Sequence, residues 1–225
     1  MQPMRSADVV RLMLLGAIWG GSFIFMRIAS PVMGAILTAE LRVGVAALVL
    51  LAIVAGKRVP LHAGRLWRHY LALGALQSAV PFALYCWAET KLDASTAAVL
   101  NATTPLFGMV TAALILGDRL SAPKVLGMAI AFAGVAGVVG GGMAGLSIDD
   151  LLPVLACLGA TLCYGLAATY TKARTTDAAP LANALGSQVA STLMLLPLLP
   201  FSWPAQAPTA DAWTAVIALG ALCTG

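Results

Sequence analysis

Charged side chains are scarce in this sequence. Asp, Glu, Lys and Arg together make up 10% of the 225 residues, whereas about 25% is usual in soluble domains. Hydrophobic residues make up 60%, before the 22 glycines are counted. This composition excludes a water-soluble globular protein, and it predicts a chain that lies in a lipid bilayer.

Residues for metal, disulfide or hydrolytic chemistry are also few. The four cysteines lie in apolar stretches without a C-x-x-C spacing, which excludes a disulfide framework, and the two histidines lack the spaced partners of a zinc site. The sequence contains no G-x-S-x-G, P-loop or H-E-x-x-H motif, so an intramembrane enzyme would depend on Glu40 and Arg42 alone. We therefore expect no enzyme, no cofactor and no metal.

Long apolar runs dominate what is present. A helix that crosses the hydrocarbon core needs about 20 residues. Runs close to this length predict seven transmembrane helices, and an eighth begins at Ala212. The seven lie at Leu12–Ala29, Met33–Ala55, Tyr70–Ala88, Ala94–Leu116, Val125–Gly141, Leu151–Thr171 and Leu181–Pro200. The first run carries Arg27 and no cleavage pattern follows it, so we interpret it as a retained span and not as a signal peptide.

The connections between these runs are charged unequally. Lys and Arg favour the cytoplasmic side of short loops. If the N-terminus is cytoplasmic, Arg27 and Lys91 are the only basic residues that lie outside. The outer connections then contain the acidic residues Glu89, Asp93, Asp149, Asp150 and Asp211. The basic residues then inside are Arg5, Arg11, Lys57, Arg58, Arg65, Arg68, Arg119, Lys124, Lys172 and Arg174. The net charge of +4 thus reflects membrane topology and predicts no nucleic-acid partner.

One segment of the chain recurs. Trp67–Ala79 reads WRHYLALGALQSA and Trp213–Gly225 reads WTAVIALGALCTG, so the two align at a shift of 146. Nearly the same shift places Trp19-Gly20 on Tyr164-Gly165, Arg27 on Lys172, and Arg42 on Gln188. We therefore predict two related units, residues 1–146 and residues 147–225, the second truncated in its third helix.

Five spans separate each position from its repeat equivalent, so the two units would cross the membrane in opposite directions. Such inverted repeats are typical of secondary transporters, in which two similar halves exchange conformations around a site at the membrane midplane. The fold class that we predict is an all-α polytopic membrane protein. It is an inverted repeat of five-helix units, with about seven and a half of ten transmembrane helices present.

Several short motifs resemble the EamA domains of the drug/metabolite transporter superfamily. The resemblance is strong over residues 10–141 and weaker beyond. It implies a ten-helix carrier of small metabolites in a bacterial inner membrane, driven by exchange or by ion gradients. The matching residues are Trp19-Gly20-Gly21-Ser22-Phe23, Arg27, Arg42, Pro105-Leu106-Phe107, Leu116 to Ser121, Gly127 and Gly134-Val135, with Asp118 where the family most often has Glu.

Glu40 and Arg42 are the leading candidates for binding or coupling. A charge inside a span costs about 2.5 to 3.5 kcal/mol on insertion scales and needs a partner or a wet cavity. The two residues point about 200° apart on a helix, so they do not pair with each other. Glu40 either carries a proton or reaches the headgroups about 10 Å from the outer end of its helix. Arg42 either packs between helices or binds a substrate carboxylate.

Two prolines near the centres of their spans add a second set of candidates. Pro81 and Pro105 cannot donate to the carbonyls of Gln77 and Asn101, and irregular backbone in a membrane is tolerated only against protein or a cavity. These residues either line a binding site or only shape the helices. Further candidates are Tyr85 beyond Pro81, Trp19 in the first span, and Gln188 as the repeat equivalent of Arg42.

We predict a secondary transporter of small organic metabolites that works by alternating access and is coupled to ions or to exchange. The alternative is a truncated membrane protein that transports nothing and acts only as an interaction partner. Expected partners are the lipid bilayer, a small-molecule substrate and, through exposed helix faces, a second copy in a homodimer. We expect the bacterial inner membrane, with a cytoplasmic N-terminus.

Overall fold

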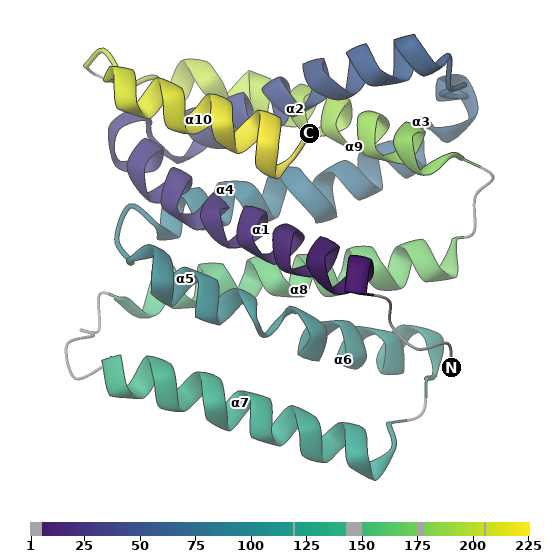
Figure 1. Cartoon of the computed structure of the whole chain (residues 1–225), viewed down its shortest axis with the longest axis vertical. Helices are drawn as coiled ribbons and strands as arrows, with labels where there is room; N and C mark the ends of the chain where they lie inside the picture. Colours follow the sequence, from purple (N-terminus) through teal and green to yellow (C-terminus); the bar gives the residue numbers. More distant parts are fainter. Residues whose placement is uncertain (1–5, 119, 143–149, 175–177, 205) are drawn as a thin grey trace.

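The structure is a computed structural model that describes residues 6–118, 120–142, 150–174, 178–204 and 206–225, and these residues form helices without strands. Figure 1 shows the helices running roughly parallel or antiparallel to one another. Their bounds are α1 Ser6–Met33, α2 Ala35–Lys57, α3 Ala63–Gly74, η1 Ala75–Ala79, α4 Val80–Ala88, α5 Ala94–Asn101, α6 Thr104–Leu116, α7 Ala122–Gly142, α8 Leu151–Ala173, α9 Pro180–Leu195, η4 Leu196–Phe201 and α10 Ala210–Cys223.

The helices lie where the apolar runs predicted them. Six helical segments of the described residues are long and apolar enough to cross a membrane, and shorter apolar helices cover Ala122–Gly134 and Ala210–Cys223. The third span begins earlier than predicted, at Ala63, because a basic and aromatic amphipathic turn precedes its apolar part. Arg5, Arg119, Asp149 and the repeat boundary between 146 and 147 lie outside the described residues.

Helix breaks occur beside the two central prolines. The third span passes through a π-helical turn, Ala75–Ala79, just before Pro81. The fourth span is interrupted at residues 102 and 103, just before Pro105. At that break the Thr104 hydroxyl donates to the carbonyl of Asn101 over 2.8 Å, which replaces the amide that proline lacks.

The bundle has two ends, which we name by residues of their loops. The Gly34 end carries Gly34, Glu89 and Asp93 and lies at the left of Figure 1, and the Lys57 end lies opposite. Gly34 connects α1 to α2 with a φ of 82°, a conformation that glycine adopts without a steric cost. Both charged candidates on α2 lie in the half nearer the Gly34 end.

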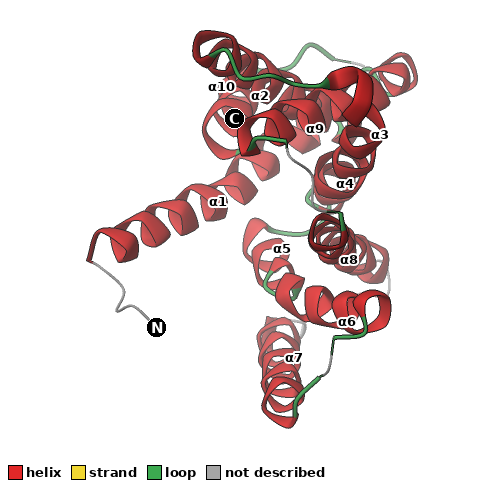
Figure 2. Cartoon of the chain, turned by 90° about the vertical axis from the view of Figure 1, so that its right-hand side faces the viewer, coloured by secondary structure: helices red, strands yellow, loops and turns green. Residues whose placement is uncertain are grey.

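The main core lies between α1, α2, α4, α8 and α10. Phe23, Val43, Phe82, Cys157 and Leu219 are among its buried members. Figure 2 shows α7 at one edge beyond α6, and the first half of α1 extending away from the other helices. The interior positions nearest the core are therefore supplied by α1, α2, α4 and α8.

Two glycines bring helices into close contact at repeat-equivalent positions. A Cβ on Gly74 would lie 2.8 Å from the carbonyl oxygen of Ser187 on α9. A Cβ on Gly220 would lie 2.6 Å from the Cβ of Val45 on α2. Small residues permit this approach of helices in lipid. The third helix of each proposed unit thus touches the second helix of the other.

Asp93 caps the N-terminus of α5 and makes a testable contribution to stability. Its carboxylate accepts from the Thr96 amide at 2.8 Å, from the Thr96 hydroxyl at 2.9 Å, and from the Ser95 hydroxyl. The Ser95 hydroxyl and the Thr96 amide hold the pKa of Asp93 below its ordinary value. Asp93→Ala should lower the free energy of unfolding by about 1 kcal/mol at neutral pH.

The sign of the pH dependence follows from that lowered pKa. The contribution of Asp93 is present above the pKa of the unfolded chain, and it is lost as the pH falls through the folded-state pKa. Thermal unfolding in detergent across acidic pH measures this. Asp93→Asn, an uncharged cap, should keep most of the stability and lose this pH dependence. An equal pH response in wild type and Asp93→Asn would contradict the assignment.

Candidate functional site

Arg42 holds a buried positive charge in the core. The residue is 6% exposed, and its guanidinium carbon lies 3.6 Å from the centroid of the Phe82 ring. Its Nε donates to the Thr224 hydroxyl at 2.8 Å, and its Nη1 donates to the Met26 sulfur at 3.2 Å. Thioether sulfur is a weak acceptor, so the hydrogen-bonding capacity of this guanidinium is poorly used.

No carboxylate forms an ion pair with Arg42 within the part of the chain that the structure describes. Arg11 with Asp8 and Lys172 with Asp118 do form ion pairs, both between exposed side chains. Arginine is the side chain best suited to bind a carboxylate with two parallel hydrogen bonds. The guanidinium is therefore placed to bind an anionic group of a ligand.

An aromatic and amide cluster adjoins Arg42. The Tyr85 hydroxyl donates to Asn101 Oδ1 at 3.0 Å. The Tyr85 ring meets Phe23 edge to face at 5.5 Å and stacks with Tyr164 at 6.4 Å between centroids. The Phe82 ring, which lies against Arg42, belongs to the same buried cluster as Phe23 and Tyr85. The structure thus unites two predicted candidates, Tyr85 and Asn101, with aromatic residues from α1 and α8.

Glu89 lies fully buried at the Gly34 end, one residue past α4. Its exposed fraction is 0%, and neither carboxylate oxygen has a hydrogen-bond partner. Arg27 reaches this residue but donates to the backbone carbonyl, over 2.6 Å. Burial raises the pKa of Glu89 to about 9, an effect that Arg42 and Arg27 oppose in part. The connection between the third and fourth spans therefore supplies an unpaired acid to the interior.

The other predicted candidates are dispersed. Glu40 is buried, and its Oε2 has no hydrogen-bond partner, but no contact joins it to Arg42. Gln188 is 8% exposed and donates to the Ser78 hydroxyl at 3.1 Å. Gln77 and Trp19 are exposed at the surface of the bundle. Gln77 therefore does not join Asn101 in one polar cluster, because it is exposed within the π-helical turn, whereas Asn101 accepts from the buried Tyr85.

The two prolines differ in their surroundings. Pro81 is buried at the start of α4, one residue before Phe82, whereas Pro105 is exposed at the start of α6. Pro81 lies beside the residues that contact Arg42. Pro105 instead lines a pocket of about 270 Å³ between α6, α7 and α8, towards the Lys57 end.

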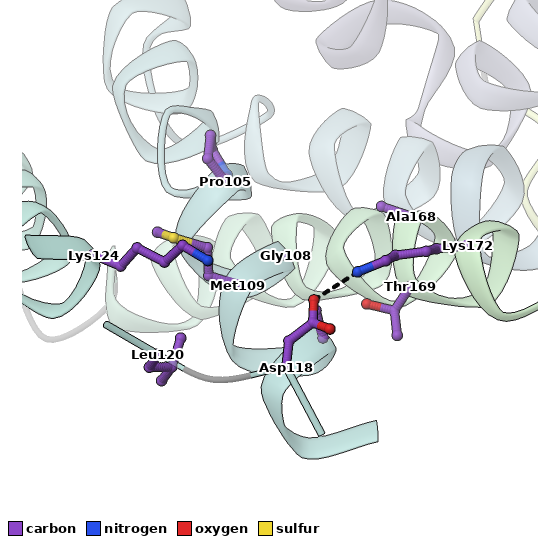
Figure 3. A pocket seen from close by; sticks show the side chains of 10 residues that line it. Pro105, Gly108, Met109, Asp118, Leu120, Lys124, Ala168, Thr169 and Lys172 are labelled. Carbon is purple, nitrogen blue, oxygen red and sulfur yellow. Dashed lines mark hydrogen bonds and ion pairs between the residues drawn. The ribbon is translucent and has the colours of Figure 1, made fainter. Parts of the chain in front are cut away.

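That pocket is shown in Figure 3, and Arg42 is not among the residues that line it. Apolar side chains such as Met109 and Leu120 line it together with Lys124. On one wall Lys172 Nζ and Asp118 Oδ2 form an ion pair at 2.6 Å. Because its cation and its anion neutralise each other, this wall offers less unpaired charge to a ligand than Arg42 does.

Sequence reasoning missed Glu89, Phe82 and Tyr164 as members of the site. Glu89 follows the apolar run directly and resembles any acid of an outer loop, and only the tertiary fold shows that it is fully buried, with Arg27 of α1 donating to its carbonyl. For Tyr164 a signal existed, because the repeat alignment places it on Trp19. The two are not equivalent in exposure: Trp19 is 59% exposed, and Tyr164 is half-buried.

Comparison with known proteins gives consistent results. The EamA-like transporter family matches residues 9–140. A Streptantibioticus cattleyicolor protein named a probable terminal-alkyne amino-acid exporter is 33% identical over 200 residues, which cover 87% of this chain and 65% of that protein. An uncharacterized transporter of Archaeoglobus fulgidus is 24% identical over 195 residues, 85% of this chain and 67% of that protein. The chain thus spans about two thirds of the length of these curated relatives.

A solved crystal structure has a similar fold. Its TM-score is 0.71 at 17% sequence identity, and the match covers 98% of this chain and 77% of that one. At this identity the similarity concerns the arrangement of helices alone.

Proposed function

Because this chain belongs to the EamA-like transporter family, we propose that it carries a small organic solute across a bacterial inner membrane by alternating access. The observation that carries the proposal is the family match over residues 9–140. The chain is a multi-pass membrane protein, since six of its helical segments are long and apolar enough to span a bilayer. This favours a carrier over an enzyme and over a membrane protein that only binds partners.

An inverted repeat would provide the two alternating states, and two hydrogen bonds support it. Arg42 binds Thr224, and Gln188 binds Ser78. In the repeat alignment, with its shift of 146 positions, Arg42 corresponds to Gln188 and Ser78 corresponds to Thr224. The two hydrogen bonds therefore join the same two positions of the repeat. The glycine contacts of Gly74 with α9 and Gly220 with α2 show the same relation.

The directions of the helices also support inversion. Arg42 lies seven residues after the start of α2, near the Gly34 end, and Gln188 lies eight residues after the start of α9, near the Lys57 end. Two equivalent polar contacts therefore lie towards opposite ends of the bundle. We propose that they hold opposite sides of the carrier, so that opening one side breaks one contact and preserves the other.

The solute class that we propose is a small amino acid. A buried guanidinium suits a carboxylate, and the relative from Streptantibioticus cattleyicolor is named a probable terminal-alkyne amino-acid exporter.

We further propose export, coupled to an ion gradient or to exchange, with the Lys57 end facing the cytoplasm. This orientation is tested with single cysteines introduced at Lys57 and at Thr90, which are treated with an impermeant thiol reagent on intact cells. Thr90→Cys should be labelled from outside, and labelling of Lys57→Cys from outside would contradict the orientation.

The proposal is tested by counterflow in proteoliposomes. Vesicles preloaded with unlabelled norvaline should accumulate labelled norvaline, and also propargylglycine, a terminal-alkyne amino acid, faster than protein-free vesicles do. A saturable rate that needs internal solute would indicate a carrier. Equal rates with and without the protein, for these and for other small amino acids, would favour the non-transporting alternative.

A further inference from the structure

Glu89 is a buried acid for which the helix packing provides no partner. It lies immediately after α4, where α1 reaches it through Arg27. Ser30 of α1 is equally buried, and its hydroxyl also lacks a partner. Burial without a partner favours the protonated form of Glu89, in agreement with its raised pKa, and a cation that binds beside it would favour the charged form. Glu89 is therefore a buried acid whose carboxyl oxygens lack a hydrogen-bond partner.

The two residues adjoin consecutive residues of α1, yet they form no ion pair. Arg42 donates to Met26 of α1 and lies over Phe82 of α4, and Arg27 of α1 donates to the Glu89 carbonyl just beyond the end of α4. Arg42 also donates to Thr224, away from Glu89. The same part of the bundle thus holds a guanidinium and a carboxyl group, each with hydrogen-bonding capacity that the protein leaves unused.

We propose that Glu89 receives the ammonium group of an amino-acid solute while Arg42 receives its carboxylate, so that the two side chains together select a zwitterion. This inference rests on the proposed function. The carboxylate of the solute replaces the weak Met26 sulfur as acceptor for Arg42 Nη1. The ammonium group donates to the Glu89 oxygens, for which the described residues provide no donor.

Glu89 is then a specificity-determining residue, and its effect is measured as a ratio. Norvaline carries both charged groups, pentanoate lacks the ammonium group, and butylamine lacks the carboxylate. Wild-type protein should take up norvaline at least about tenfold better than either analogue, because each analogue leaves one buried charge unpaired. A ratio between solutes does not depend on the amount of folded protein.

Three variants test the assignment in proteoliposomes. Glu89→Gln should reduce the preference for norvaline over pentanoate to near unity, and Glu89→Asp, which keeps the charge, should retain part of it. Asp93→Asn removes an exposed acid from the same connection between the third and fourth spans and should leave the preference unchanged. If Glu89→Gln keeps the wild-type preference, or if Asp93→Asn alone abolishes it, the inference is wrong.

The same experiment separates this inference from the proposed function. Norvaline uptake by wild type together with an unchanged preference in Glu89→Gln would overturn only the role of Glu89. Failure of the wild type to move norvaline, pentanoate or butylamine would overturn both. Wild-type uptake of pentanoate as fast as norvaline would retain a carrier but would exclude recognition of the ammonium group.

Discussion

Gly165→Leu is expected to disrupt the packing of α8 on α6. A Cβ at this position would lie 2.8 Å from the carbonyl carbon of Phe107 and 2.9 Å from the amide nitrogen of Gly108. These are backbone atoms, so no side-chain rotation relieves the clash, and the helices must separate. Overpacking costs about 1–3 kcal/mol, and we expect at least the upper part of that range here.

Separation of these helices would also break polar contacts between them. The Thr111 hydroxyl donates to the Gly165 carbonyl at 3.0 Å and lies 2.8 Å from the Thr169 hydroxyl. Thermal unfolding in detergent, followed by size-exclusion chromatography, measures the loss. Gly127→Leu on α7 is the matched control, because a Cβ there meets no heavy atom within 4 Å. Equal unfolding temperatures of the two variants would contradict this packing.

Arg42→Met is expected to weaken norvaline binding by about 10- to 100-fold, because hydrogen bonds to charged groups contribute about 1.5–3 kcal/mol. The protein should remain folded. Arg42 is buried and forms no ion pair in the described part of the chain, and exchanging a buried charge that lacks an ion-pair partner for an apolar side chain removes a desolvation cost. Kinetics of counterflow, with unfolding measured in parallel, separates the two effects.

Two further variants sharpen the Arg42 experiment. Arg42→Lys keeps the charge but loses the planar fork, so its affinity should lie between those of wild type and Arg42→Met. Lys57→Met removes the same charge from the exposed end of the same helix and should bind norvaline as the wild type does. An unchanged affinity of Arg42→Met would exclude a carboxylate-binding role.

The helix positions could be predicted from the sequence because lipid imposes a simple rule. A run of about 20 apolar residues has to be helical to satisfy its own backbone groups, and the runs at 33–55, 94–116 and 151–171 match α2, α5 with α6, and α8 closely. The rule says nothing of which face of a helix points inward. Sequence reasoning therefore included Gln77, which is exposed, and omitted Glu89, which is buried.

The candidate site was predictable only in part, for the same reason. Arg42 stood out because a charge inside a span needs compensation, and the repeat alignment added Gln188, which the structure buries. The contacts of Arg42 come from residues as distant along the chain as Met26, Phe82 and Thr224. Nothing in local spacing relates these residues to one another.

The sequence by itself determined the membrane environment and the helix positions, because hydrophobicity and the length of apolar runs are properties of the linear chain. The recurrence of one segment also predicts an internal repeat. The tertiary structure decided which polar groups meet. It turned Tyr85 towards Asn101, buried Glu89 without a hydrogen-bond partner for its carboxyl oxygens, and placed the Arg42 guanidinium over the Phe82 ring. The physical reason is that burial and electrostatic pairing depend on distances between helices, and packing alone sets these.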